Sequence, residues 1–139
     1  MKIFPVAFFV LISSISVGHA GELYIYEQNG SVMDVFYSGD TISISYSNPR
    51  AGLKQAGVKS GDFAFKGFVE GQRYSGTAFA FKVGCVPAPY EVIGEKDDFD
   101  TITLKGPAPV RKKSGCAVLR YSLSSPHAIL RFRYSSTHH

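Results

Sequence analysis

Residue types that carry familiar chemistry are scarce in this chain of 139 residues, which has no Trp, two Cys and four His. Its length leaves no room for a second domain. Ser-His-Asp catalysis needs a histidine that packing can orient. Outside the segment 1–20 and the terminal histidine pair, the only histidine is His127, in a Ser-Ser-Pro-His turn. Neither cysteine has the neighbouring histidines that are typical of a zinc site. The sequence therefore predicts no catalytic set, no metal and no cofactor.

Apolar runs long enough to span a membrane are also lacking. The longest run lies at 3–17, which is short of the ~20 residues that a membrane helix needs. It follows a positively charged start and precedes Gly18 and Ala20, the small residues that a signal peptidase requires. We therefore expect a signal peptide at 1–20, a single β-rich domain at 21–139, and export to the periplasm or the extracellular space. The absence of a cysteine at the cleavage point argues against a lipoprotein.

The charge is modest. The chain has 15 Lys and Arg against 11 Asp and Glu, and removal of the leader with its one lysine changes the net charge from +4 to +3. Nucleic acid is seldom the partner of a small exported domain with so little charge. The hydrophobic fraction is 45% and the charged fraction is 19%. These values argue against intrinsic disorder. We expect a protein or an anionic component of the cell envelope as the partner.

The two cysteines predict one disulfide. An exported chain meets oxidising conditions, and two cysteines allow only one intramolecular pair. Cys85 and Cys116 lie 31 positions apart in the sequence. Closing this loop would stabilise the fold by about 3–4 kcal/mol. Two free thiols are the alternative.

The remaining pattern is that of an all-β protein. The 11 Phe and 8 Tyr suit strands better than helices. Asn29-Gly30 between two β-rich runs predicts a hairpin, and Ile42, Ile44 and Tyr46 alternate with serines. Strand signals recur at short intervals along the chain. We expect a small antiparallel barrel or sandwich of eight to nine short strands, with successive hairpins favouring a closed meander.

The segment 47–61 interrupts the strand pattern and predicts a short helix of about two turns. Asn48 can cap its start, and Pro49 suits its first turn. Gly57 supplies a left-handed end, which would bring Val58 into contact with Leu53. We expect this helix to cover an open end of the sheet; an irregular loop is the alternative.

The last third of the chain predicts a hairpin and a basic patch. We expect 116–123 and 128–134 to pair around a turn at 124–127. The charged side chains on this hairpin and in the loop before it form a possible anion-binding patch. Its members are Arg111, Lys112, Lys113, Arg120, Arg131 and Arg133. A solvated strand face with edge-protecting charges is the alternative.

Seven short segments between residues 32 and 134 carry a resemblance. They are Tyr46-Ser47-Asn48-Pro49-Arg50-Ala51-Gly52-Leu53, Ala56-Gly57-Val58, Tyr74-Ser75-Gly76-Thr77-Ala78, Gly84-Cys85, Gly106-Pro107-Ala108-Pro109-Val110, Gly115-Cys116 and Ile129-Leu130-Arg131-Phe132. With them the chain resembles a small exported β-rich domain of alphaproteobacterial proteins, found alone after a signal peptide or beside caspase-like peptidase domains. The resemblance implies a bacterial exported domain with paired cysteines; it assigns no activity and no functional residues.

These observations together favour a non-catalytic binding or interaction module. One concrete form is an inhibitor of an exported hydrolase such as a protease or a lysozyme. Another is a barrel that holds a small ligand, because eight strands enclose a space just wide enough for side chains or one small molecule. An enzyme with a scattered active site is the runner-up class, and a purely structural or envelope-associated role is the remaining alternative.

Overall fold

The computed structural model describes residues 21–137; the expected signal peptide at 1–20 lies outside the described residues. No helix in the described part of the chain is long and apolar enough to cross a membrane. The elements between residues 21 and 137 are β1 (Glu22–Gln28), β2 (Ser31–Ser38), β3 (Thr41–Asn48), α1 (Ala51–Gln55), β4 (Phe63–Glu70), β5 (Arg73–Ala80), β6 (Ala88–Lys96), β7 (Thr101–Lys105), β8 (Ala108–Arg111), β9 (Val118–Ser122), the 3-10 turn η1 (Pro126–Ala128) and β10 (Ile129–Thr137).

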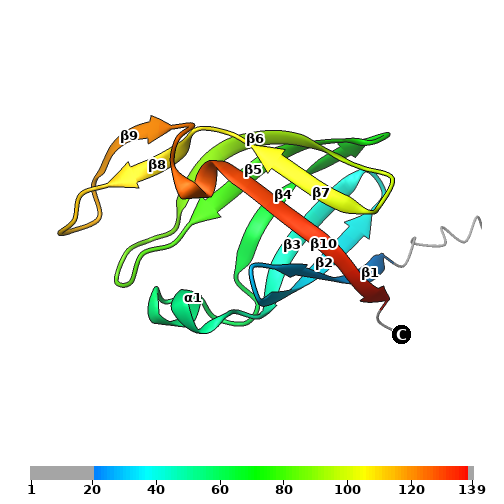
Figure 1. The fold of residues 1–139 in the computed structure, drawn as a ribbon, viewed down its shortest axis with the longest axis horizontal. Coiled ribbons are helices and arrows are strands. Elements are labelled where there is room, and N and C mark those ends of the chain that lie inside the picture. Colours follow the sequence, from blue (N-terminus) through cyan, green and yellow to red (C-terminus); the bar gives the residue numbers. More distant parts are fainter. Residues whose placement is uncertain (1–20, 138–139) are drawn as a thin grey trace, which may run out of the picture.

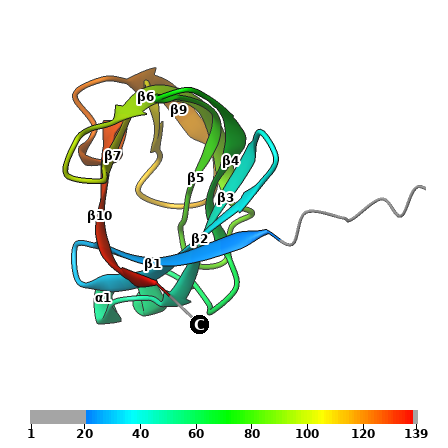
Figure 2. The ribbon, with the colours of Figure 1, turned by 90° about the vertical axis from the view of Figure 1, so that its right-hand side faces the viewer.

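Eight of the strands formed by residues 21–137 close into an antiparallel barrel (Figure 1). Strands β1 to β7 follow one another as a meander, and β10 lies between β7 and β1. Tyr26 of β1 pairs with Tyr134, while Phe132 pairs with Ile102 of β7. The expected all-β fold is confirmed, and the barrel is the correct choice over the sandwich. Figure 2 views the barrel from the end that holds the β2–β3 turn and the C-terminus.

Side chains fill the barrel interior. Inward and outward positions alternate along each strand, so one residue in two can enter the core. Ile42, Ile44 and Tyr46 alternate as expected and are buried. Phe65 and Phe132 are inaccessible to solvent at the centre of the core. The interior of an eight-stranded barrel is just wide enough for its own side chains. The packed side chains therefore occupy the space that a deep ligand cavity would need.

Glycines on β4, β5 and β6 allow the barrel wall to bend. Gly67 pairs with Gly76 across β4 and β5, and a Cβ on either residue would overlap the backbone of the neighbouring strand. A Cβ on Gly94 of β6 would overlap the carbonyl oxygen of Thr103. Such close backbone approaches are a recognised use of glycine inside strands, because they let a small sheet coil tightly enough to close.

Two local predictions are confirmed by backbone geometry. Asn29 and Gly30 have φ values of 47° and 88° and form the turn between β1 and β2. Gly57, with φ 92°, ends α1 in the left-handed conformation. The Val58 N–H then donates to the Leu53 carbonyl oxygen at 3.0 Å, as in a Schellman ending.

The predicted start of the helix is wrong. Asn48 is the last residue of β3, and α1 begins at Ala51, after Arg50. The Arg50 N–H donates to the hydroxyl of buried Ser31 at 2.9 Å, and Pro49 is also buried. These contacts hold the chain extended for two residues beyond β3 and delay the helix. Helix α1 lies at the end of the barrel away from the C-terminus (Figure 1), and its Leu53 packs against the core.

The predicted C-terminal hairpin is also wrong. Strand β9 pairs with β8, whereas β10 pairs with β7 and β1. The reason is burial: β9 has no buried residue, while β10 carries Phe132 into the core. Strand β8 begins at Ala108, next to Pro107. Pro89 lies in β6 opposite Phe79, in a part of the strand that pairs with β5 but not with β7.

Candidate functional site

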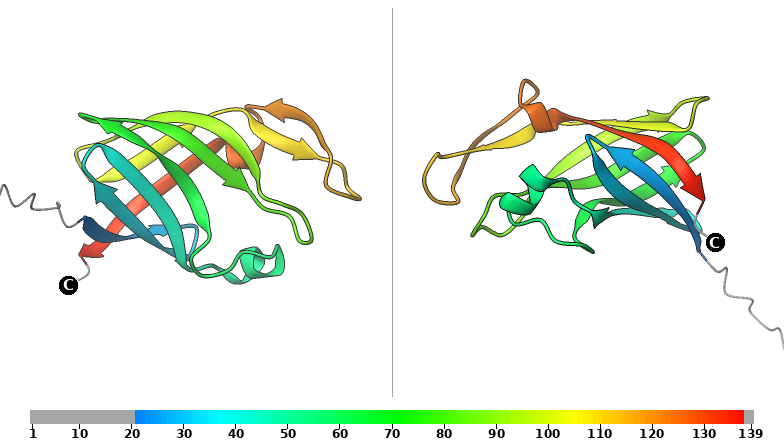
Figure 3. Two further views of the ribbon diagram at one scale, coloured as in Figure 1. Left: turned by 180° about the vertical axis from the view of Figure 1, so that it is seen from behind. Right: turned by 60° about the horizontal axis from the view of Figure 1, so that its bottom comes forward.

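Two segments leave the barrel at the same end and are joined to each other. One is the loop at 81–87 between β5 and β6; the other is 106–125, which contains β8 and β9. We call these two segments the arm. Figure 1 shows β8 and β9 projecting beyond the barrel wall, and both views in Figure 3 show the same projection. A partner could therefore reach the arm without approaching the barrel wall.

A disulfide joins the two segments of the arm. The sulfur atoms of Cys85 and Cys116 are 2.08 Å apart and their Cα atoms are 5.5 Å apart. The separation of the two Cα atoms lies within the range for a native bridge. The predicted pairing is thus confirmed. Disulfides persist in oxidising surroundings, so this bond indicates an oxidising compartment.

A lysine also holds the tip of the β8–β9 hairpin against the other loop. The ammonium group of Lys82 donates to the carbonyl oxygens of Lys112 at 2.9 Å, Lys113 at 3.1 Å and Gly115 at 2.7 Å. An ammonium group has three protons to donate, so these contacts satisfy it fully. Lys82 therefore fixes the shape of the hairpin tip.

Arg111 has a similar structural role, which the sequence did not predict. Its guanidinium group donates to the carbonyl oxygens of Cys116 at 2.7 Å and Val86 at 2.9 Å, on both sides of the disulfide. A planar guanidinium with five protons suits several carbonyl acceptors at once. The expected anion-binding role of Arg111 thus competes with contacts that hold the arm together.

Exposed apolar side chains gather on the arm. Scattered single apolar residues are normal on a surface, but a group of them on one projecting element marks an interaction site. Their exposed fractions run from 55% to 84%. They are Val83, Val86, Leu119, Tyr121 and Leu123.

The arm is also free of acidic residues. Segments 81–87 and 106–125 contain five cationic side chains and no Asp or Glu. The rest of 21–139 has nine basic and eleven acidic residues, a net charge of −2. The small positive charge of the domain therefore arises from a strongly basic arm attached to a weakly acidic barrel. Such a separation of charge orients an approaching charged partner toward one end of the molecule.

The predicted basic patch is divided by the fold. Lys112 and Lys113 lie at the hairpin tip, and Arg120 is exposed on β9 opposite Val110. Because β9 does not pair with β10, the remaining two arginines lie elsewhere, on the outer face of the barrel. There Arg133 pairs with Glu27 of β1 and Arg131 with Thr103 of β7. The structure thus places four of the six predicted residues on the arm, namely Arg111, Lys112, Lys113 and Arg120.

His127 lies in η1, where it contacts the barrel end. Its N–H donates to the Ser125 hydroxyl at 3.3 Å, and its carbonyl oxygen accepts the Tyr90 hydroxyl at 2.7 Å. Although the side chain reaches the surface, surrounding protein atoms desolvate the ring and lower its pKa, and the positive charge of Arg50 lowers it further. Among the described residues, no group of three or more His, Cys, Asp or Glu could hold a metal ion.

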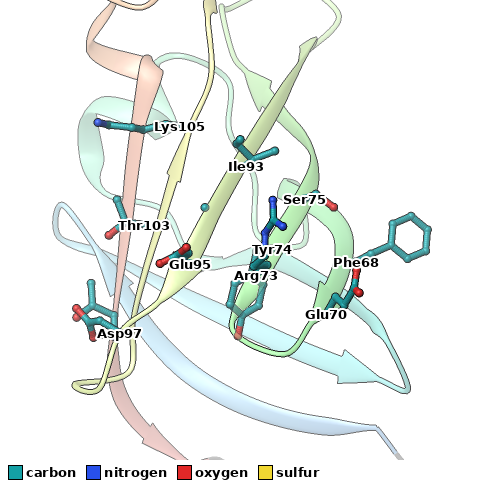
Figure 4. Close-up of a pocket in the computed structure, with 12 residues that line it drawn as sticks. Phe68, Glu70, Arg73, Tyr74, Ser75, Ile93, Glu95, Asp97, Thr103 and Lys105 are labelled. Carbon is teal, nitrogen blue, oxygen red and sulfur yellow. Dashed lines mark hydrogen bonds between the residues drawn. The ribbon is translucent and has the colours of Figure 1, made fainter.

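The outer face of β4 to β7 carries a groove that the sequence analysis missed. Figure 4 shows Phe68, Arg73, Ile93 and Glu95 coming from three neighbouring strands of this face. The groove has a volume of about 730 Å³. Arg73 lies directly opposite Glu95 in the strand register, and such pairs of opposite charge stabilise antiparallel sheets. Phe68 and Ile93 are exposed apolar residues on these strands, each between buried or half-buried neighbours, and two large apolar residues at outward positions were the only sequence signal for the groove.

Comparison with known proteins gives no relative: no family model, no curated protein and no solved structure matches the chain. The resemblance to exported alphaproteobacterial domains therefore stays a prediction. The arm, defined by its own geometry and charge, is the candidate functional site.

Proposed function

We propose that the protein is an exported bacterial binding module without catalytic activity, and that its arm docks an acidic protein in the periplasm or the extracellular space. The observation that carries the proposal is the composition of the arm. It combines five cations, no acidic residue and five exposed apolar side chains on one projecting element.

The chemistry of the arm suits a protein partner better than a small molecule. Leu119 and Tyr121 present apolar and aromatic surface, and aromatic residues are enriched at the centres of protein interfaces. Lys112 and Lys113 at the hairpin tip and Arg120 on β9 add positive charge to the same hairpin. Charges at the rim of an interface raise the association rate and favour partners of opposite sign.

The covalent closure of the arm supports tight binding. Association costs free energy when loops must be ordered in the complex. The disulfide and the carbonyl contacts of Lys82 and Arg111 already order both segments in the free protein. A partner would therefore meet a preformed surface.

Export is supported by two independent features. The sequence of 1–20 has the layout of a signal peptide. The disulfide between Cys85 and Cys116 indicates an oxidising compartment. A partner in that compartment is itself exported. An exported hydrolase whose acidic active-site cleft receives the arm is the most concrete form of this proposal, and the protein would then be its inhibitor.

The test is capture of a partner from the exported fraction of the source bacterium by the immobilised protein. Leu119→Ser with Tyr121→Ser removes apolar surface from the arm, and Lys112→Ser with Lys113→Ser removes charge from its tip. Phe68→Ser with Ile93→Ser is the matched control, because these side chains are 61% and 63% exposed but lie on the barrel wall. All six positions are exposed, so the variants should fold.

We expect a stoichiometric acidic protein to be captured by the wild type and by the barrel control. The Leu119/Tyr121 variant should lose it, and the Lys112/Lys113 variant should bind it more weakly at low salt than the wild type does. The proposal is wrong if both arm variants capture as well as the wild type, or if the wild type captures no protein. It is equally wrong if the arm binds anionic lipid vesicles in place of a protein.

A further inference from the structure

A second concave site lies at the opposite end of the barrel from the arm. Strands β1, β2 and β10 and the β6–β7 turn surround a cavity of about 500 Å³. This volume is within the usual range for small-molecule sites. We call the cavity the mouth; Figure 2 looks toward this end of the barrel. Its walls are four tyrosines with two acids and one lysine: Tyr24, Tyr26, Tyr37, Tyr134, Glu22, Asp100 and Lys96.

The tyrosine rings stand at steep angles to one another. The rings of Tyr24 and Tyr37 have centroids 5.8 Å apart and planes at 78°. Tyr26 and Tyr134 repeat this arrangement at 5.6 Å and 81°. Tyr24 and Tyr134 connect the two pairs, at 6.4 Å and 60°. Rings at these distances and angles pack edge to face against one another. Because all four tyrosines line the cavity, a ligand inside it can contact more than one of them.

Hydrogen bonds hold two of these rings in place. The Tyr24 hydroxyl donates to the Glu22 carboxylate at 2.7 Å, and the hydroxyls of Tyr37 and Tyr74 share a hydrogen bond of 2.9 Å. Desolvation by burial raises the pKa of Tyr37, and the hydrogen bond to Tyr74 raises it further, so this group is neutral at physiological pH. These hydroxyls are therefore engaged with protein groups, which leaves the ring surfaces as contacts for a ligand.

The charge at the mouth is negative. Glu22 and Asp100 contribute two negative charges, and Lys96 contributes one positive charge through an ion pair of 3.5 Å with Asp100. The field of Asp100 reaches the cavity wall, because it raises the pKa of Tyr26 in addition to the larger effect of burial. Three further acidic residues lie in the adjoining turns, namely Asp40, Asp97 and Asp98. A cation is therefore favoured here and an anion is repelled.

We propose that the mouth binds a small organic cation, with a quaternary ammonium group held against the tyrosine rings. A quaternary ammonium has no N–H to donate, so it gains from aromatic surface rather than from hydrogen bonds, and boxes of aromatic rings recognise it through cation–π attraction. Glu22 and Asp100 add long-range attraction. This site is independent of the arm and of the partner proposed for it.

The test is calorimetric titration of the oxidised protein with choline and with its uncharged isostere 3,3-dimethylbutan-1-ol. The two molecules have the same shape and differ in charge at one atom. We expect saturable one-to-one binding of choline, about tenfold tighter than that of the isostere, because cation–π attraction acts on the charged molecule alone. Equal binding of both molecules would show that shape alone is recognised and would overturn the proposal.

Variants locate the binding site. Tyr24→Leu and Tyr134→Leu keep apolar bulk but remove the ring, and each should weaken choline binding about tenfold. Tyr121→Leu is the matched control, because this exposed tyrosine lies on the arm, and it should leave the affinity unchanged. Unfolding curves of each variant show whether the fold is retained. Unaltered binding in both mouth variants, no saturable binding of choline by the wild type, or binding of a neutral sugar in its place would contradict the proposal.

Discussion

Removal of the disulfide should weaken the fold without destroying the barrel. The bond between Cys85 and Cys116 closes a loop of 31 positions, and the loss of this constraint on the unfolded chain corresponds to about 3–4 kcal/mol. Phe65, Phe132 and most other core residues lie in the barrel, outside the segments that the bond joins. Domains of this size have roughly 5–15 kcal/mol of stability, so a folded barrel should remain.

The assay is urea unfolding of a Cys85→Ser, Cys116→Ser double variant, followed by circular dichroism. With an m value of roughly 1.5 kcal/mol per molar urea, the midpoint should fall by about 2 M. Ser114→Ala, at the exposed hairpin tip, is the control and should unfold like the wild type. A midpoint shift below about 0.5 M would refute the loop-closure argument. Loss of the cooperative transition would refute the claim that the barrel core is independent of the arm.

Four further outcomes follow from the barrel. Gly94→Ala should destabilise or unfold it, because the new Cβ meets the carbonyl oxygen of Thr103. Gly71 has open space around it and a φ of 63°, so Gly71→Ala should cost only about 1 kcal/mol in the same urea assay. Acidification below pH 6.5 should lower the free energy of unfolding, because His127 binds a proton at higher pH in the unfolded state than in the folded state. In His127→Gln, the urea midpoint should depend less on pH than in the wild type. Burial raises the pKa of four tyrosines, to about 12 for Tyr46; the other three are Tyr26, Tyr37 and Tyr90. These groups ionise at lower pH in the unfolded chain than in the folded one, so above about pH 10 the free energy of unfolding should fall by about 5 kcal/mol per pH unit. Tyrosinate absorbance and circular dichroism should then change together, whereas ionisation near the ordinary tyrosine pKa with an intact barrel would contradict the prediction.

Local signals in the sequence were sufficient for most of the barrel. The alternation at Ile42 and Ile44, the Asn29-Gly30 turn and the left-handed end at Gly57 each act within a few residues, so propensity alone could find them. Prediction of the disulfide needed only the number of cysteines and the expectation of an oxidising compartment.

Long-range pairing was beyond such reasoning. Strand β9 looks like a partner for β10 because it precedes it along the chain, but it pairs with β8 and none of its side chains is buried, whereas β10 carries Phe132 into the core. The same error placed Arg120 beside Arg131 and Arg133. The structural role of Arg111 depends on carbonyl groups 25 positions away at Val86, and no local pattern announces such a contact.

The mouth could not be predicted from local sequence either. Its tyrosines come from the first two strands and the last one, so only closure of the barrel by β10 brings Tyr24 and Tyr134 together. In the sequence each is one aromatic residue in an alternating strand, and the core explains such residues equally well. The charge separation between arm and barrel was likewise visible only after the fold had assigned each residue to one of the two.

Hydrogen–deuterium exchange of the protein with and without its captured partner tests the central claim most directly. The account predicts that binding protects backbone amides at 81–87 and 106–125, with the barrel strands unchanged. Protection centred on the mouth or on the outer face of β4 to β7, with none in the arm, would contradict the assignment of the arm as the docking surface.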